Sequence, residues 1–352
     1  MEWIVARWLT YVATLVMTGA CAAGMLLLPR ARIDEDTRRV VAREAARVGI
    51  GAALLMIPAS LLRLADQVMA LRSPGDPLMP SVDALLLSTM WGMGFLVQCA
   101  ALLIAGIGLA LAARAPGARL PWMIAALGAA GLCATPALQG HAIGSEEFTS
   151  LAVAADVAHV LGASLWLGTL AVIGWLGITL PNADGVLTDD RAARGDARLR
   201  VLVPLVPPIA LPGAALLIGS GVIASVLHLR AVSDLWRDEW GRYVLAKTVA
   251  ALVIVILGAL NWRRLGPRMA RGDGTSSLRK SLLTELAIGL LILIITSVLV
   301  VTPLPGERET TLHDRLESQH LRLGRSVPAV FEMLSLRDRK QYARPINHDA
   351  FA

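Results

Sequence analysis

Three histidines lie where polar side chains are rare, within or at the ends of long apolar segments. His141, His159 and His228 come from three different segments of this kind. An imidazole inside a membrane either makes a hydrogen bond between helices or contacts a metal ion or a cofactor. Because these segments bring imidazoles toward one side, we predict that His141 and His159 bind a metal ion or a redox cofactor. His228 either joins them or lies at the membrane interface.

Thioether groups accompany these histidines. Met90 and Met93 are three residues apart near the beginning of another apolar segment. Imidazole and thioether groups together suit copper, and the thioether favours Cu(I). Methionine is also common filler between apolar helices, so the two residues are either ligands or packing. Copper is therefore the expected species, and haem b, held by histidines from separate helices, is the alternative.

Charged residues inside the apolar segments have predicted partners. Asp156 precedes His159 by three residues, so its carboxylate shares a helix face with the imidazole and is expected to orient it. Lys247 is expected to pair with Asp66 or Asp156. Arg63 and Asp66 are three residues apart and are expected to neutralise each other.

The elements that must position these groups are membrane spans. Of the 352 residues, 55% are hydrophobic and 17% are charged, and the mean hydropathy is +0.61. A soluble protein of this length could not bury so much apolar surface, and a helix needs about 20 apolar residues to cross the hydrocarbon core. The runs are continuous rather than alternating, which predicts an all-α polytopic bundle. Eight spans are expected, at residues 3–28, 47–71, 82–113, 120–139, 150–180, 201–229, 241–262 and 280–302.

Basic residues predict the orientation of these spans. The connections on one side hold 18 Arg and Lys residues, whereas those on the other side hold three, Arg72, Arg230 and Arg237. Arg and Lys accumulate in cytoplasmic loops, so the first side is cytoplasmic and both termini are outside, in the periplasm of a Gram-negative cell. The net charge of +6 is then explained by cytoplasmic loops that face anionic lipid, and not by binding to nucleic acid.

The last 50 residues differ from the spans in composition. Eight basic and seven acidic residues occur at 303–352, and leucines suggest a short amphipathic helix. The chain therefore divides into a transmembrane domain at 1–302 and an extracytoplasmic tail at 303–352. The tail is too short to bury a core of its own. It is expected on the membrane surface or, through residues 306–352, on other membrane subunits.

Several motifs resemble those of the copper resistance D family of membrane proteins. They are LQGHAIG at 138–144, DVAHVLGASLWLG at 156–168, SGVIASVL at 220–227, the helix at 243–264 with its Lys and Asn-Arg, and a last span with prolines at 285–305. The resemblance is strongest over 130–305. It implies eight spans with outward termini in the bacterial inner membrane, and copper movement from the periplasm toward the cytoplasm. It also implies that His141 and His159 match the family's two membrane histidines. A periplasmic copper chaperone is an expected partner.

Three functions remain open at this point. The first is copper transport through a site on the outer side. The second is an accessory or scaffolding subunit that keeps the fold without transport. The third is a haem b-binding redox subunit. The sequence contains no Gly-x-Ser-x-Gly, His-Glu-x-x-His or phosphate-binding glycine motif, so an enzyme is not expected.

Overall fold

The computed structural model describes residues 2–31, 33–73, 75–139, 149–179, 202–229, 231–270 and 275–302. These residues belong to one unit, Met1–Thr302, and the remaining unit, Pro303–Ala352, lies outside them. The amphipathic helix expected in the tail therefore stays a prediction. Within the described ranges the regular structure is helical throughout, which confirms the predicted all-α class.

Eight of the described helical segments are long and apolar enough to cross a membrane, as the sequence predicts. The helices in chain order are α1 (Glu2–Ala22), α2 (Glu35–Leu71), α3 (Leu78–Ser88), α4 (Met90–Arg114), α5 (Arg119–Leu138), α6 (Thr149–Ala163), α7 (Thr169–Thr179), α9 (Pro207–His228), α10 (Asp234–Arg237), α11 (Glu239–Ala270) and α12 (Thr275–Leu299). The π-helical turn η4 (Ser164–Gly168) joins α6 and α7 into one span.

Two boundaries differ from those expected from hydropathy. Helix α2 begins at Glu35 rather than near residue 47, because the Asp34 side chain accepts a hydrogen bond from Thr37 N at 2.8 Å and caps the helix. The predicted span at 82–113 is two helices, α3 and α4. Thr89 between them is extended (φ −121°, ψ 150°), and its Oγ1 accepts from Gly92 N at 3.0 Å. Hydropathy cannot detect this break because the flanking residues are apolar on both sides.

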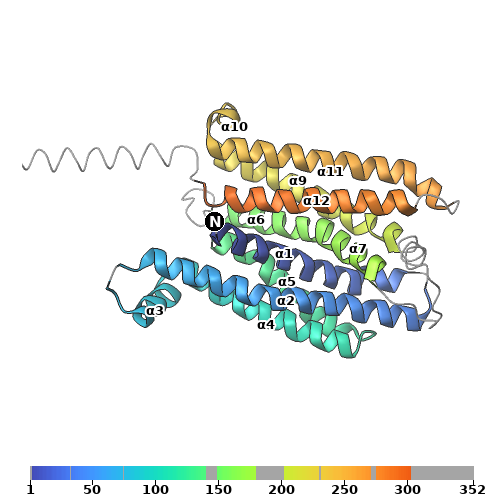
Figure 1. Ribbon diagram of the computed structural model, residues 1–352, viewed down its shortest axis with the longest axis horizontal. Helices are drawn as coiled ribbons and strands as arrows, with labels where there is room; N and C mark the ends of the chain where they lie inside the picture. The colour runs from blue at the N-terminus through green and yellow to red at the C-terminus, as the bar shows by residue number, and fades with distance from the viewer. Residues whose placement is uncertain are drawn as a thin grey trace, which may run out of the picture. The chain divides into compact units, whose positions relative to one another are not determined.

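Helix α1 is the centre of the bundle. It packs against α2, α5, α7, α12 and η4, and 72% of its most apolar window is buried (Figure 1). Backbones touch where α1 meets η4, since a Cβ on Gly19 would overlap the Gly168 backbone and a Cβ on Gly168 would overlap the Leu15 carbonyl. Small residues of this kind let membrane helices approach closely. By contrast, only 17% of the α9 window and 6% of the α11 window are buried.

One end of the bundle carries α3, α10 and the beginning of α1 (Figure 1), and we call it the α3–α10 end. Helices α4, α6 and α11 also begin there, and α2, α5 and α9 end there, as the alternation of spans requires. His159, Ser220 and Lys247, which are discussed below, each lie within about ten residues of a helix terminus at this end. Of the three histidines that the sequence places toward one side, His159 and His228 lie in the parts of their helices nearer this end, and His141 lies outside the described residues.

Candidate functional site

His159 lies at the junction of three helices. It is ten residues after the first residue of α6, which corresponds to a depth of about 15 Å from that terminus. Its Nδ1 lies 3.2 Å from Ser220 Oγ on α9, and its Nε2 lies 3.1 Å from Lys247 Nζ on α11. Both ring nitrogens are therefore engaged by side chains that are distant in sequence. We call this set the His159 junction.

Glycines allow α6 and α9 to come close enough for this contact. A Cβ on Gly162 would lie 2.6 Å from both Gly213 O and Leu217 N, so the two backbones are in contact one turn beyond His159. A Cβ on Gly221 would lie 3.3 Å from His159 Cε1. Larger residues at these positions would push α9 away from the imidazole, and Ser220 would lose its contact with Nδ1.

The donors and acceptors of the His159 junction follow from the hydrogen bond that the Ser220 hydroxyl donates. Ser220 Oγ donates its only hydrogen to the carbonyl of Leu217, which cannot donate in return (3.1 Å). Ser220 Oγ is therefore the acceptor toward His159, and Nδ1 carries the ring hydrogen. In a neutral imidazole this leaves Nε2 with its lone pair, and Lys247 donates to it. The lone pair that would bind a metal ion is thus occupied by the Lys247 amine.

A carboxylate adds to the same junction. Asp156 is one turn before His159 on α6 and interacts electrostatically with Lys247. A carboxylate, an imidazole and an amine therefore gather near one point at membrane depth. The predicted pairing of Lys247 with Asp66 of α2 stays a prediction.

The other predicted ligands are placed as follows. His141 lies outside the described residues, and His228 is the last residue of α9. Met90 and Met93 begin α4 with side chains that are 59% and 55% exposed, whereas His159 is half-buried. Among the residues that the structure describes, no group of three or more His, Cys, Asp or Glu side chains is placed to hold a metal ion. The ligand set expected from the sequence thus stays a prediction.

Two further contacts were missed by reasoning from sequence. Ser220 was not singled out as a partner for His159, although it lies in a motif that was noted. Cys133 of α5 is buried between Thr18 Oγ1 of α1 at 3.6 Å and Ser164 Oγ of η4 at 3.8 Å. Spacing along the chain gives no signal for either contact, because each joins residues that are more than 30 positions apart.

Two segments of this chain match models of one protein family. Residues 1–151 match the model of the copper resistance protein D-like N-terminal domain, and residues 207–299 match that of copper resistance protein D. The chain belongs to the copper resistance protein D family. Ser220 and Lys247 of the His159 junction fall within the second matched segment of this family. His159 itself falls between the two segments.

A curated relative of the copper resistance protein D family also matches. The copper transport protein CutJ of Bacillus subtilis (strain 168) is 28% identical over 177 residues, which are 50% of this chain and 30% of the relative. The chain therefore covers less than a third of that relative's length. No solved structure matches.

Proposed function

We propose that this chain carries copper across the membrane and that His159 belongs to its outward-facing binding site. Family membership and the eight spans support a role in copper transport or resistance. The observation that carries the proposal is the His159 junction. There, two side chains of the family-matched segment 207–299 hold an imidazole about 15 Å below a helix terminus. Intramembrane ionisable groups of this kind mark ion pathways.

Exchange at Nε2 gives the site a physical basis for both binding and release. A copper ion and the Lys247 amine would use the same lone pair, so the ion binds only as Lys247 moves away. Conduction requires sites that bind well enough to capture an ion and weakly enough to release it. Lys247, held 3.1 Å from Nε2, is a competitor that supports release. In this proposal His141, His228, Met90 and Met93 supply the further ligands.

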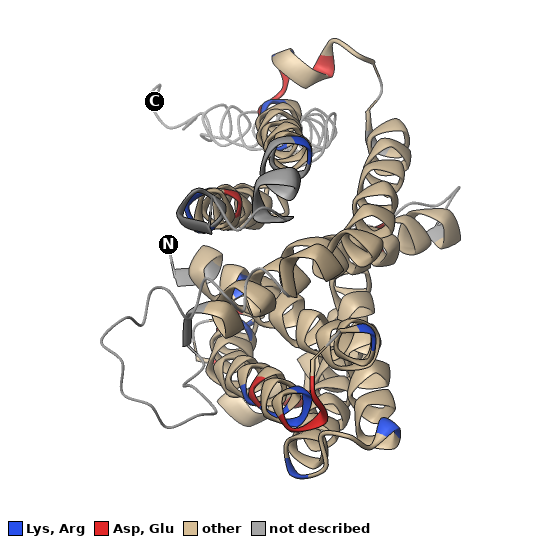
Figure 2. Cartoon of the chain, turned by 90° about the vertical axis from the view of Figure 1, so that its right-hand side faces the viewer, with Lys and Arg blue, Asp and Glu red and all other residues tan. Residues whose placement is uncertain are grey.

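The proposed orientation places both termini and the α3–α10 end outside, in the periplasm. Figure 2 looks onto the opposite end of the bundle, and blue Lys and Arg segments of the described residues mark several helix ends there. This distribution supports a cytoplasmic position for that end. Copper would then enter near His159, and the proposed donor is a periplasmic chaperone.

A transport assay tests this function. The full chain is reconstituted in liposomes, and copper entry is measured for the wild type, for His159→Ala and for the double variant His141→Ala, His159→Ala. We expect the double variant to lose at least about 90% of the uptake, because removing a ligand from a metal site commonly costs tenfold or more in affinity. His348→Ala, in the 303–352 segment, is the matched control and should transport normally. Unchanged uptake in the double variant would refute the proposal.

Optical and metal analysis of the same preparations separates the alternatives. Copper that co-purifies with the wild type and is lost in the double variant supports transport. A Soret band lost in the double variant would instead indicate a haem b subunit. If neither is present and removal of residues 306–352 abolishes assembly with other membrane proteins, the accessory role is favoured. His159→Gln, which retains a hydrogen-bonding side chain, replaces the alanine variant if that variant fails to fold.

A further inference from the structure

The span that carries His159 contains a π-helical turn a few residues beyond the imidazole. This turn, η4, occupies Ser164–Gly168, between the end of α6 and the beginning of α7. The Thr169 N–H donates to the Ser164 carbonyl, five residues earlier, whereas an α-helix would use the carbonyl of Leu165. A single π turn inside a helix holds one residue more than the regular α-helix would. Such turns are rare and are frequent at functional sites.

The extra residue determines the direction in which His159 points. His159 and Ile173 of α7 are 14 residues apart. In an unbroken α-helix this separation is almost four turns of about 3.6 residues, so both side chains would face the same side. One added residue turns α6 by about 100° around the helix axis. His159 therefore points to nearly the opposite side from Ile173, at about 140° from it.

The contacts of the two halves of this span agree with that rotation. Ile173 and Leu176 of α7 are fully buried in the core cluster that also contains residues of α1 and α2. His159 of α6 instead contacts Ser220 of α9 and Lys247 of α11. The second half of the span thus packs into the core, and the first half presents an imidazole to different helices.

The bundle keeps the π turn although the turn leaves a hydroxyl unsatisfied. Thr14 and Thr18 of α1 donate their hydroxyl hydrogens to carbonyls four residues earlier. For Thr169 the equivalent carbonyl belongs to Leu165, inside the π turn, and its buried Oγ1 finds no hydrogen-bond partner among the described residues. A buried hydroxyl without a partner is costly. The π turn therefore has a local cost, and the backbone contact of Gly168 with α1 keeps η4 in place.

We propose that η4 is the element that positions His159, because its extra residue turns the imidazole toward Ser220 and Lys247. The inference rests on the proposed function where it makes His159 a copper ligand, but the rotation itself requires no metal. It assigns the positioning to the number of residues between His159 and α7, and not to the side chains of η4. A change in that number should remove the site, and a compensating change should restore it.

Three length variants of the full chain in phosphatidylcholine nanodiscs test this proposal. Deletion of Leu165 removes the extra residue, so η4 becomes α-helical and His159 turns away from its partners. An alanine inserted after Gly162 adds a further residue and should also turn His159 away. The two changes together restore the original number. Leu165→Ala, which removes the side chain and keeps the residue, is the matched control.

Two measurements follow the site in these variants. Titration against a competing copper chelator should give an affinity at least about tenfold lower for each single length change, as expected when a ligand is misplaced. The combined variant and Leu165→Ala should bind as the wild type does. The second measurement needs no copper: ¹⁵N spectra of histidine-labelled protein report which ring nitrogen carries the hydrogen. The Nδ1–H signal that is absent in His159→Gln should disappear in each single length variant and return in the combined one.

The outcomes distinguish this proposal from the proposed function. Wild-type copper affinity and an unchanged Nδ1–H signal in either single length variant would overturn the role of η4. So would a combined variant that recovers neither, when Leu165→Ala is normal. If the deletion prevents folding, the insertion and the combined variant still give the comparison. If the Nδ1–H signal changes as expected but the wild type binds no copper, η4 positions His159 and the transport proposal fails.

Discussion

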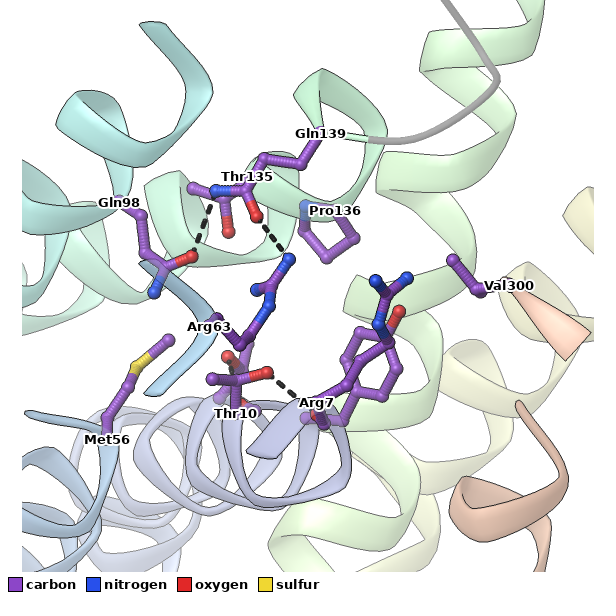
Figure 3. A pocket seen from close by; sticks show the side chains of 11 residues that line it. Arg7, Thr10, Met56, Arg63, Gln98, Thr135, Pro136, Gln139 and Val300 are labelled. Atoms are coloured by element: carbon purple, nitrogen blue, oxygen red, sulfur yellow. Dashed lines mark hydrogen bonds between the residues drawn. The ribbon is translucent and has the colours of Figure 1, made fainter. Parts of the chain in front are cut away.

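The two matched parts of the chain hold buried cations in opposite ways. In the N-terminal part, the Arg63 guanidinium donates to Gln139 Oε1, and Gln139 Nε2 donates in turn to Gln98 Oε1 (Figure 3). In the C-terminal part, Lys247 is bound by the imidazole of His159 and has a carboxylate nearby. The packing differs as well, since 72% of the α1 window is buried but only 6% of the α11 window. A neutral amide oxygen thus accepts from one buried cation, whereas an imidazole nitrogen and a nearby carboxylate accompany the other.

The largest expected effect comes from separating α6 and α9. Gly162→Leu should lower the free energy of unfolding by about 3 kcal/mol, because a side chain there would meet the backbone of Gly213 and Leu217 and overpack the contact. Unfolding in mixed micelles measures it. Gly219→Leu on α9 is the control, since a Cβ at that position meets nothing within 4 Å. Equal destabilisation by both variants would show that the close contact does not position the His159 junction.

Removing the Gln98 amide, which links Ser60 and Gln139, should affect only the N-terminal part. Gln98→Leu leaves Ser60 and Gln139 without their partner, which should cost about 2 kcal/mol. Gln98 lies outside the His159 junction, so copper binding should stay at the wild-type value. Unfolding in mixed micelles and titration against a competing copper chelator measure the two effects. Val97→Leu, on the exposed side of the same helix, is the control for added apolar volume. A parallel loss of copper binding would show that this hydrogen-bond network also supports the copper site.

Removing the Lys247 amine, which competes with copper for His159 Nε2, should strengthen copper binding. Lys247→Met frees the Nε2 lone pair, so we expect copper to bind about tenfold more tightly, the equivalent of one net hydrogen bond. Release should slow, and transport should fall although binding improves. Titration against a competing copper chelator gives the affinity, and Lys280→Met is the exposed control. Weaker copper binding in Lys247→Met would mean that Lys247 supports the site and does not compete for it.

The smallest expected effect is at the beginning of α2. The Thr37 hydrogen bond lowers the pKa of Asp34 from its usual value of 3.8. The cap therefore stabilises α2 above pH 3.8, and this contribution is lost as the pH falls through the lowered pKa. Hydrogen exchange of the first turn should accelerate only below about pH 4. Asp34→Ala should exchange rapidly at every pH, and a wild-type first turn that opens already at neutral pH would contradict the prediction.

Apolar composition and Arg bias made the membrane class and the eight spans predictable, since bilayer thickness imposes a length on every crossing helix. The depths of His159 and Lys247 are predicted from the sequence as well, because helical rise converts position into distance. The break at Thr89 did not follow from the sequence, because it depends on a single extended residue and a side-chain cap within a continuous apolar run. The proposed ligands His141, Met90 and Met93 remain sequence predictions.

The sequence by itself thus determined the all-helical class, the eight candidate spans and the family to which the chain belongs. Only the tertiary structure decided two partners that the sequence did not predict: Lys247 contacts His159, and Arg63 donates to Gln139. The physical reason is that partner choice depends on helix spacing and rotation. Helix spacing and rotation are set by backbone contacts such as that of Gly162 with Gly213. A residue pattern along a single helix does not predict such contacts.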